Sequence, residues 1–246
     1  MCRLILAAGT FDAHDIVNGA VAMAVGKTAN HDSPLRSHRD GWGAIWSDPA
    51  SSTGMSVLRD VHQADETALN SELGAVRTRF LAIHVRNATY DTTLGLQYTH
   101  PLQRSADGWY FMHNGSQPTV HKMLGLDHST FDSAEYFDYV IPAGALKLDE
   151  QQTLNRLRRI PKGGNSGNAF AVCKDRAYVI HWQTPDSPWK DYFTMHQLIE
   201  PERRVIASEV IPAIAPAKYW EPLAPDTLIE LNLGAVTAEV AHEQVN

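Results

Sequence analysis

Met1-Cys2-Arg3-Leu4-Ile5-Leu6 opens the chain and places a thiol directly before an apolar run. This run is short, and its residues predict a β-strand over 3–7, almost at the amino terminus. Cys2 would then lie directly before the first residue of this strand. The chemistry that is available to a cysteine at this position therefore bears on both fold and function.

Removal of Met1 would give Cys2 a free α-amine in addition to its thiol. An α-amine titrates at about 7.7–8.0 and a free thiol at about 8.5, so the amine can accept the thiol proton. Such a nucleophile needs no separate histidine base, as with an amino-terminal threonine. The alternative is a small residue that merely follows the initiator methionine. The catalytic interpretation requires that Met1 is removed, because a retained Met1 turns this amine into an amide.

Composition is that of a globular protein: 43% of the 246 residues are hydrophobic and 20% are charged. A chain of this length can bury a substantial core. It has no repeat with a period of roughly 20–50 residues and no low-complexity linker. We therefore expect one domain over residues 1–246.

Charge and cysteine content exclude several classes of protein. A net charge of −7 argues against nucleic acid or a membrane surface as the main partner. The apolar stretches are far shorter than the roughly 18 residues of a transmembrane helix, and no secretory signal follows Met1. Two cysteines, Cys2 and Cys173, exclude a disulfide scaffold and favour a reducing, cytoplasmic location. The histidines lack metal-ligand spacings, so we expect no metal and no cofactor.

Short apolar runs bounded by turn residues predict strands along much of the chain. They cover 3–7, 42–47, 55–59, 80–85, 109–112, 169–173, 177–182, 193–197, 205–208 and 228–233. Helical periodicity covers 16–25, 66–77, 134–141 and 150–158, with Asp132-Ser133 as the expected cap of the third helix. Neighbouring strands such as 169–173 and 177–182 favour hairpins. The order predicts an α+β domain of mostly antiparallel sheets with helices on the outer faces.

Two motifs adjoin expected strands in the first half of the chain. In Ser37-His38-Arg39-Asp40-Gly41-Trp42-Gly43, the glycines Gly41 and Gly43 permit close approach of another segment or a positive φ. Taken alone, this motif is better interpreted as a simple loop-to-strand turn. In Ile83-His84-Val85-Arg86-Asn87-Ala88-Thr89, strand alternation puts His84 and Arg86 on one face. The planar fork of Arg86 suits a carboxylate ligand, although a surface ion pair is the alternative.

Two further motifs follow. In Tyr98-Thr99-His100-Pro101, the proline favours an extended His100, which we interpret as a structural, hydrogen-bonded histidine. In Phe111-Met112-His113-Asn114-Gly115-Ser116, the pair Asn114-Gly115 is by itself a turn signal. In an active site, the Asn114 amide and the Gly115 N–H could instead converge on one oxygen. Loss of one such oxyanion donor typically lowers a rate by about 10²–10³-fold.

The ordered set of Cys2, H-x-D-G-W-G, H-V-R-x-A-T, T-H-P, H-N-G-S and F-D-S-A-E resembles the class II glutamine amidotransferases. In these amino-terminal-nucleophile hydrolases, the first cysteine attacks the side-chain amide of glutamine. The resemblance runs from Cys2 to about Glu135 and continues weakly over 205–209 and 219–223. It implies a four-layer αββα sandwich of two mostly antiparallel sheets.

The resemblance also implies roles for individual residues. Cys2 corresponds to the nucleophile, and Asn114 with the N–H of Gly115 to the oxyanion pair. Arg86 and Thr89 correspond to the residues that bind the α-carboxylate of glutamine.

The remaining family positions hold or support the substrate. Asp132 corresponds to the acid that receives the α-ammonium group. His84 and His100 match histidines that support the pocket, while Gly41 and Gly43 would allow the turn close to the nucleophile.

The chain departs from family members that are fused to synthase domains. Asn87 stands where those members commonly have tryptophan, and Tyr90 stands where they tend to have glycine. These departures, and a length that leaves no room for an acceptor domain, argue against coupling to an ammonia channel. The sequence is more similar to the stand-alone branch, which includes a γ-glutamyl hydrolase of ergothioneine biosynthesis.

The expected function is hydrolysis of a γ-glutamyl amide, either glutamine or a γ-glutamyl conjugate, through a Cys2 thioester. The products would be glutamate and either ammonia or an amine. One alternative is a glutaminase subunit that feeds ammonia to a separate synthase partner. A non-catalytic glutamine-sensing module is the alternative from another class, but a sensor would have no need for the nucleophile.

Overall fold

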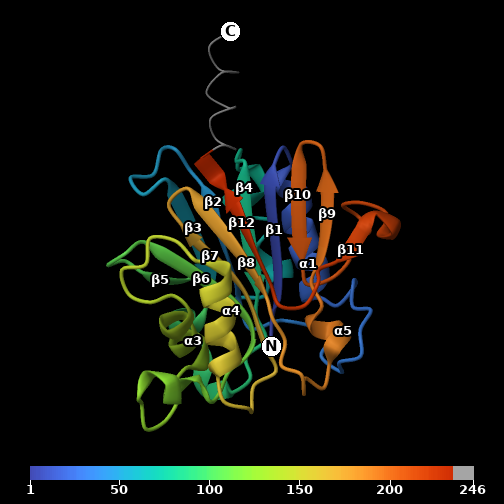
Figure 1. The fold of residues 1–246 in the computed structure, drawn as a ribbon. Helices are drawn as coiled ribbons and strands as arrows, with labels where there is room; N and C mark the ends of the chain where they lie inside the picture. The colour runs from blue at the N-terminus through green and yellow to red at the C-terminus, as the bar shows by residue number, and fades with distance from the viewer. Residues whose placement is uncertain (235–246) are drawn as a thin grey trace.

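The strand predicted at the amino terminus lies inside a seven-stranded antiparallel sheet of the computed structural model, which describes residues 1–234 (Figure 1). Both faces of this strand are buried, with Ile5 and Ala7 packed on one side and Leu4 and Leu6 on the other. In spatial order the sheet contains β11 (Trp220–Pro222), β9 (His196–Glu200), β10 (Arg203–Ala207), β1 (Arg3–Gly9), β4 (Phe80–Val85), β2 (Trp42–Ser47) and β3 (Met55–Asp60).

A second antiparallel sheet packs face to face against the first. Leu4 and Leu6 of β1 contact its apolar side chains, including Met112 and Phe170, in the core between the two sheets. In spatial order this sheet contains β12 (Thr227–Asn232), β8 (Arg176–His181), β7 (Ser166–Cys173), β6 (Trp109–Ser116) and β5 (Leu102–Arg104).

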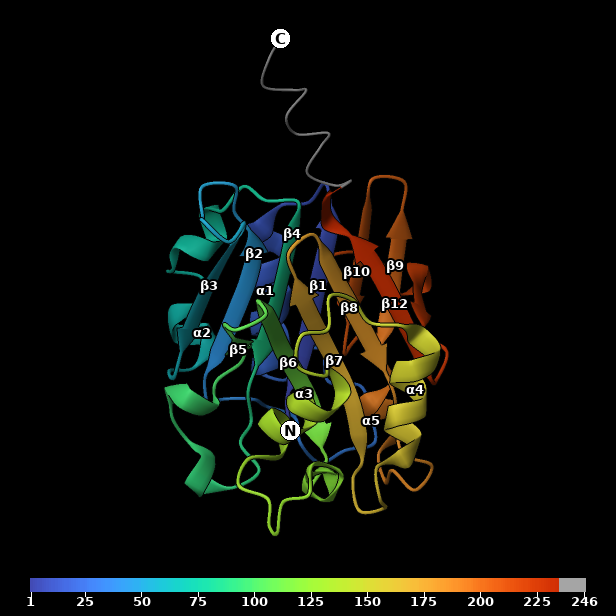
Figure 2. The ribbon, with the colours of Figure 1, turned by 60° about the vertical axis from the view of Figure 1, so that its left-hand side comes forward.

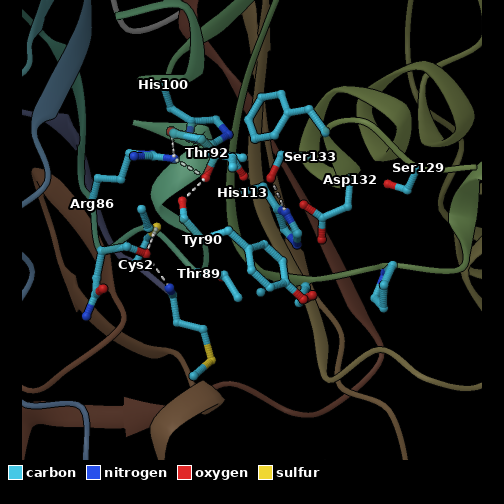
Figure 3. Close-up of a pocket in the computed structure, with 18 of the residues that line it drawn as sticks. Cys2, Arg86, Thr89, Tyr90, Thr92, His100, His113, Ser129, Asp132 and Ser133 are labelled. Carbon is cyan, nitrogen blue, oxygen red and sulfur yellow. Dashed lines mark hydrogen bonds between the residues drawn. The ribbon is translucent and has the colours of Figure 1, made fainter. Parts of the chain in front are cut away.

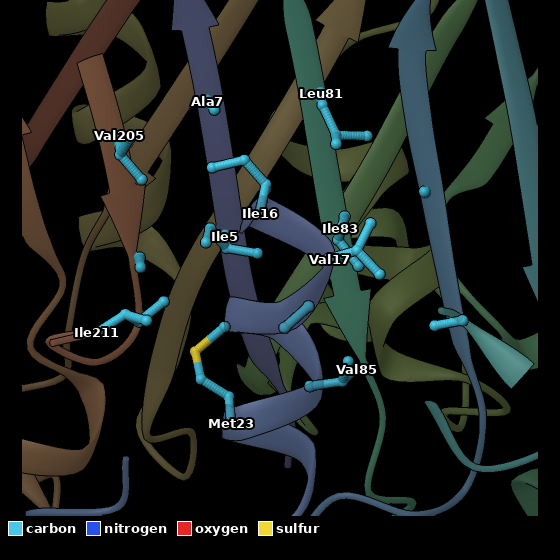
Figure 4. Close-up of a cluster of buried hydrophobic side chains, with 14 of the residues drawn as sticks. Ile5, Ala7, Ile16, Val17, Met23, Leu81, Ile83, Val85, Val205 and Ile211 are labelled. Atoms are coloured by element: carbon cyan, nitrogen blue, oxygen red, sulfur yellow. The ribbon is translucent and has the colours of Figure 1, made fainter. Parts of the chain in front are cut away.

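Helices cover the outer face of each sheet. On the first sheet, α1 (Ala13–Ala24) packs Ile16 and Val17 against Ile5 and Ile83, as Figure 4 shows. On the second sheet lie α3 (Asp132–Val140) and α4 (Glu150–Arg159). In Figure 2, α3 is in front of β6 and β7, and α4 is to its right, where it contacts β12. The predicted four-layer αββα sandwich of two antiparallel sheets is therefore confirmed.

The helix predicted over 66–77 is wrong. The segment forms two short pieces instead, α2 (Ala64–Thr67) and the 3₁₀ helix η1 (Glu72–Ala75). Ser71 separates them, because its hydroxyl accepts from the amide of Leu73 and also donates to the carbonyl of Ala68. These local bonds compete with a continuous helix. The other short helices are η2 (Asp91–Thr93), η3 (Leu96–Tyr98), η4 (Val120–Leu124), α5 (Lys190–Phe193) and η5 (Ala217–Tyr219).

Three further expectations need correction. The predicted strand 193–197 begins only at His196, because Phe193 ends α5. The predicted strand 109–112 continues to Ser116, so Asn114-Gly115 lies within a strand and forms no turn. The third helix includes Asp132-Ser133, and its N-cap is Phe131, whose amide donates to the side chain of Glu135.

The domain predicted over 1–246 stays a prediction, and its last residues, 235–246, lie outside the described residues. Within residues 1–234, no helix is long and apolar enough to span a membrane.

Candidate active site

A cavity of about 320 Å³ opens where β1 begins and where β4 and β6 end. Arg86 and Cys2 reach it from one side, and Asp132 and Ser133 from the other (Figure 3). Of the predicted site residues, those in its wall are Cys2, Arg86, Thr89, His100, Gly115 and Asp132. The other four, Gly41, Gly43, His84 and Asn114, do not line it.

Cys2 is hydrogen-bonded to Asn114, a residue that does not itself line the cavity. The backbone amide of Cys2 donates to Oδ1 of Asn114 over 2.9 Å, and both residues are buried. This bond fixes the orientation of the Asn114 amide. Because Oδ1 faces the amide of Cys2, the donor group Nδ2 is at the opposite side of the side chain. Nδ2 is buried and has no hydrogen-bond partner within the described residues. A buried, unpaired donor is costly and is suited to an oxygen of a bound ligand.

The thiol of Cys2 lies in an electropositive environment. Burial raises its pKa, but His84, the terminal ammonium group and Arg86 together outweigh burial and lower the pKa to about 6. His84 is itself oriented, because its Nε2 donates to the carbonyl of His113 over 3.2 Å. Its Nδ1 is buried, and a hydrogen bond from His84 to the thiol also lowers the pKa of Cys2. The thiolate is the nucleophilic form of cysteine, so this environment favours reactivity.

Met1 lies in the wall of the cavity beside Cys2. Its ammonium group donates to the carbonyl of Asn87, and Nδ1 of His38 donates to the carbonyl of Met1 over 3.0 Å. Met1 therefore occupies space next to the thiol, and its loss would convert the amide of Cys2 into an α-amine.

Arg86 directly follows β4 and is held through its backbone by the loop that precedes β2. Its amide donates to the carbonyl of Gly41 over 2.9 Å, and its carbonyl accepts from the amide of Asp40 over 2.9 Å. In the side chain, Nη2 donates to the carbonyl of Thr93 over 2.6 Å. Nη1 is buried and unpaired within the described residues. A free guanidinium nitrogen in a cavity wall suits a carboxylate ligand.

Asp132 is the first residue of α3, where the helix dipole favours a negative charge. Its Oδ2 accepts from the backbone amide of Gln117 over 2.7 Å, which orients the carboxylate at the cavity. Thr89 lies on the exposed rim, beside Tyr90. The cavity therefore presents the cation of Arg86 opposite the anion of Asp132.

Gly43 and Gly41 are required by close backbone contacts. A Cβ on Gly43 would lie 2.1 Å from the carbonyl oxygen of His100. Gly41 has φ +103°, and a Cβ there would lie 2.6 Å from the oxygen of Asp60. Both glycines therefore allow the segment at the start of β2 to approach the backbone at Asp60 and His100 closely, as expected from the sequence.

His100 lies in the cavity wall with its ring 4.3 Å from that of His84. Both of its ring nitrogens are buried and unpaired within the described residues, which disagrees with the hydrogen-bonded histidine that we expected. Burial, followed by repulsion between a protonated ring and the neighbouring histidines and arginines, holds the pKa of His100 well below its usual range. His100 is therefore neutral.

Gly115 is paired with Gly167 in the β6–β7 ladder. A Cβ on Gly115 would lie 1.9 Å from the carbonyl oxygen of Ser166, so no other residue fits without displacing β7. Because Gly115 has no side chain, β7 can approach β6 closely here, and β6 continues as a strand through this position.

Sequence reasoning gave no role to His113, which lines the cavity, or to Asp40, which supports it from outside. His113 lines the cavity, with Nδ1 accepting from the hydroxyl of Ser133 and Nε2 donating to the carbonyl of Ser166. Asp40 accepts from the amide of Ala88 through Oδ2 over 2.7 Å and so supports the segment that carries Arg86. Both lie within motifs already singled out, which was the only signal for them. No group of three or more His, Cys, Asp or Glu side chains in residues 1–234 is arranged to hold a metal ion.

Comparison with known proteins gives one family match. Residues 17–132 match the family model of the class II glutamine amidotransferases. The matched segment includes Arg86, Asn114, Gly115 and Asp132, while Cys2 precedes it. No curated protein matches the sequence.

Solved structures resemble the chain over nearly its whole length. Glutamine phosphoribosylpyrophosphate amidotransferase from B. subtilis has a TM-score of 0.66 and 17% identity, covering 94% of this chain and 47% of its own. An allosteric regulatory enzyme of purine biosynthesis has a TM-score of 0.67 and 17% identity, with the same two coverages, 94% and 47%. This chain thus spans about half the length of these two relatives.

A class II glutamine aminotransferase domain protein from Silicibacter pomeroyi matches with a TM-score of 0.59 and 14% identity, covering 95% of this chain and 96% of its own. These identities are low, and the likeness concerns the fold. The chain has the fold of the amino-terminal-nucleophile hydrolases.

Proposed function

We propose that this chain hydrolyses γ-glutamyl amides through a thioester on Cys2, with glutamine or a γ-glutamyl conjugate as substrate. The observation that carries the proposal is the bond from the amide of Cys2 to Oδ1 of Asn114. It places the residue that carries the thiol next to Nδ2 of Asn114, a buried donor that has no hydrogen-bond partner among residues 1–234. The match of residues 17–132 to the class II glutamine amidotransferases supports the same chemistry.

Recognition of the substrate would use the two charges of the cavity. Nη1 of Arg86, which has no hydrogen-bond partner within residues 1–234, would bind the α-carboxylate, and Thr89 lies on the rim of the cavity. Asp132 would receive the α-ammonium group. Binding both charges at one end of the substrate directs the γ-amide toward the thiol, and such positioning contributes strongly to rate.

In the first step, Sγ of Cys2 attacks the carbonyl carbon of the γ-amide, and the α-amine of Cys2 takes the thiol proton. The developing oxyanion is stabilised by Nδ2 of Asn114 and the N–H of Gly115. The C–N bond then breaks, the ammonium of Cys2 returns the proton to the leaving nitrogen, and a thioester remains. Water attacks the thioester, which releases glutamate and restores the thiol.

Action on a free γ-glutamyl conjugate, without a tethered synthase, is the form of the reaction that we favour. The side chain of Asn87 donates to the carbonyl of Ser37, so it is engaged by the loop before β2. Tyr90 is 67% exposed at the rim of the cavity, where the leaving amine of a larger substrate could pass.

The test uses 6-diazo-5-oxo-norleucine, an electrophilic glutamine analogue, with protein whose Met1 is absent by intact mass. We expect one covalent adduct, located on Cys2, and none in Cys2→Ala. Cys173 provides an internal control because it lies at the end of β7, away from the cavity. A protein that binds glutamine and never labels would be a sensor, and the proposal would then be wrong.

The substrate is identified by incubating the same protein with glutamine and a panel of γ-glutamyl amides. Release of glutamate, measured by mass spectrometry, should occur with the wild type and be absent in Cys2→Ala. Faster turnover of conjugates than of glutamine supports the hydrolase. Turnover of glutamine alone, accelerated by a synthase, would support a glutaminase subunit.

A further inference from the structure

A second set of buried polar side chains lies next to Cys2, outside the cavity. Arg3 is fully buried, and its Nε lies 2.6 Å from Oε1 of Glu209. The guanidinium group also stacks over the ring of Tyr192, with Cζ 3.4 Å from the ring centroid. Neither Arg3, Glu209 nor Tyr192 lines the cavity. These three residues therefore have no direct route to a substrate bound there.

Tyr192 connects this cluster to Cys2. Its hydroxyl donates to the carbonyl of Cys2 over 3.3 Å, and its own carbonyl accepts from Nη1 of Arg3 over 2.9 Å. Burial, more than any neighbouring charge, raises the pKa of Tyr192, so the hydroxyl keeps its proton and donates. Tyr192 lies in α5, which Figure 1 places beside the amino terminus. A segment far along the chain thus holds the residue before β1.

The loop after α1 makes further contacts with the cluster of Arg3, Glu209 and Tyr192. Oε2 of Glu209 accepts from the hydroxyl of Thr28 over 2.5 Å, and Oε1 lies 3.5 Å from Nε2 of His31. The amide of Tyr192 donates to Oδ1 of Asp32 over 3.2 Å. Removing one partner of a buried ion pair is strongly destabilising, so the paired charges keep this arrangement together.

After loss of Met1, fewer hydrogen bonds hold the amino terminus, and the bond from the hydroxyl of Tyr192 to Cys2 is one that remains. The bonds from Met1 to Asn87 and from His38 to Met1 disappear with that residue. The backbone groups of Cys2 then retain Asn114 at the nitrogen and Tyr192 at the carbonyl oxygen. With both ends of the residue held, rotation about the Cα–Cβ bond is the freedom left to the thiol.

We propose that Tyr192 is a positioning residue that holds Cys2 for attack, and that the Arg3–Glu209 pair holds Tyr192 in place. This inference rests on the proposed function of Cys2 as the nucleophile. A misplacement of about 1 Å can cost about 10²-fold in rate, so a bond to the backbone of the nucleophile is expected to affect the chemical step.

The test variant is Tyr192→Phe, which removes the hydroxyl and keeps the ring that stacks on Arg3. The matched control is Tyr139→Phe, whose hydroxyl donates to the carbonyl of Arg156 between α3 and α4. All proteins are used with Met1 removed, as verified by intact mass. We measure kcat and KM for the substrate turned over by the wild type, the rate of labelling by 6-diazo-5-oxo-norleucine, and the Tm.

We expect Tyr192→Phe to lower kcat and the labelling rate by about 10- to 10²-fold, with little change in KM. Tyr139→Phe should leave both rates unchanged. A purely structural role of the hydroxyl would lower the Tm and leave the labelling rate of the folded protein at the control value, which would overturn the proposal. A wild type that never labels would instead refute the nucleophile itself.

Arg3→Lys keeps the charge opposite Glu209 and loses the fork that also reaches Tyr192. If Tyr192→Phe does not fold, Arg3→Lys tests the positioning role instead. We expect a fall in kcat with an unchanged KM, and an unchanged kcat would contradict the positioning role.

Discussion

The backbone amide of Cys2 donates a hydrogen bond to Oδ1 of Asn114 over 2.9 Å, across 112 positions of the sequence. Cys2 precedes the central strand of one sheet, and Asn114 lies in β6 of the other. The bond therefore spans the two sheets at the edge of the cavity. It distinguishes the two ends of the asparagine amide, because Oδ1 accepts from Cys2 while Nδ2 has no hydrogen-bond partner in the described part of the chain.

Asn114→Asp tests the unpaired end of this amide. The aspartate keeps an oxygen that can accept from Cys2, but it replaces the Nδ2 donor with a negative oxygen. We expect kcat to fall by at least about 10²–10³-fold, since one oxyanion donor is lost and a repulsive charge is added. Steady-state kinetics of glutamate release provide the measurement. Asn155→Asp on the exposed face of α4 is the control, and equal activity of the two variants would refute the assignment.

Arg86→Lys tests the proposed carboxylate site. The lysine keeps a positive charge but loses the planar fork, in which Nη2 donates to Thr93 and Nη1 has no partner among the described residues. We expect KM to rise by at least about tenfold, equivalent to about 1.4 kcal/mol, with a smaller change in kcat. Arg158→Lys, at an exposed ion pair with Asp226, should behave as the wild type. A wild-type kcat/KM in Arg86→Lys would exclude this role.

Asp40→Asn tests whether the loop before β2 supports the substrate site. The charged Oδ2 of Asp40 accepts from the amide of Ala88 over 2.7 Å, two residues beyond Arg86. Asparagine is a weaker acceptor, because hydrogen bonds to charged groups are stronger than neutral ones. We expect KM to rise severalfold while kcat stays near its wild-type value. A selective loss of kcat would show instead that Asp40 acts on the nucleophile.

The pH dependence of Cys2 alkylation tests its electropositive environment. In the chain that retains Met1, burial raises the pKa of Cys2, and His84, the terminal ammonium and Arg86 lower it to about 6. The thiolate therefore predominates above this pH and is lost as the pH falls. Alkylation by iodoacetamide should reach a plateau near pH 7 and fall about tenfold at one pH unit below the midpoint.

In Cys2→Ser, alkylation must come from Cys173, where burial raises the pKa of the thiol. Its rate should therefore increase only in the alkaline range. A wild-type profile with the same alkaline midpoint as this variant would contradict the lowered pKa of Cys2.

Gly43→Ala tests the packing beside the site. The new Cβ would lie 2.1 Å from the carbonyl oxygen of His100 and 2.9 Å from that of Leu58, and both are backbone atoms. Overpacking of this kind typically costs about 1–3 kcal/mol in the free energy of unfolding. Urea denaturation measures it, with Gly74→Ala as the control because its Cβ would be 3.6 Å from the nearest atom. Equal stability of both variants would show that His100 can move away.

The sequence by itself determined most of the long elements and their order. The apolar runs at 42–47 and 80–85 coincide with β2 and β4, and alternation along β4 correctly separates Ile83 from His84. These patterns are readable because successive side chains on a strand point to opposite faces of the sheet, which is a local property. The motifs also contain the residues that line the cavity, including Arg86 and Asp132.

Only the tertiary structure decided which of these residues meet. Asn114-Gly115 is a turn signal in isolation, but β7 approaches so closely at Ser166 that the strand continues through it. Tyr192 shares no motif with Cys2, yet its hydroxyl reaches the carbonyl of that residue. Such contacts depend on how segments far apart in the chain pack and on the register between strands. A local pattern carries no information about either.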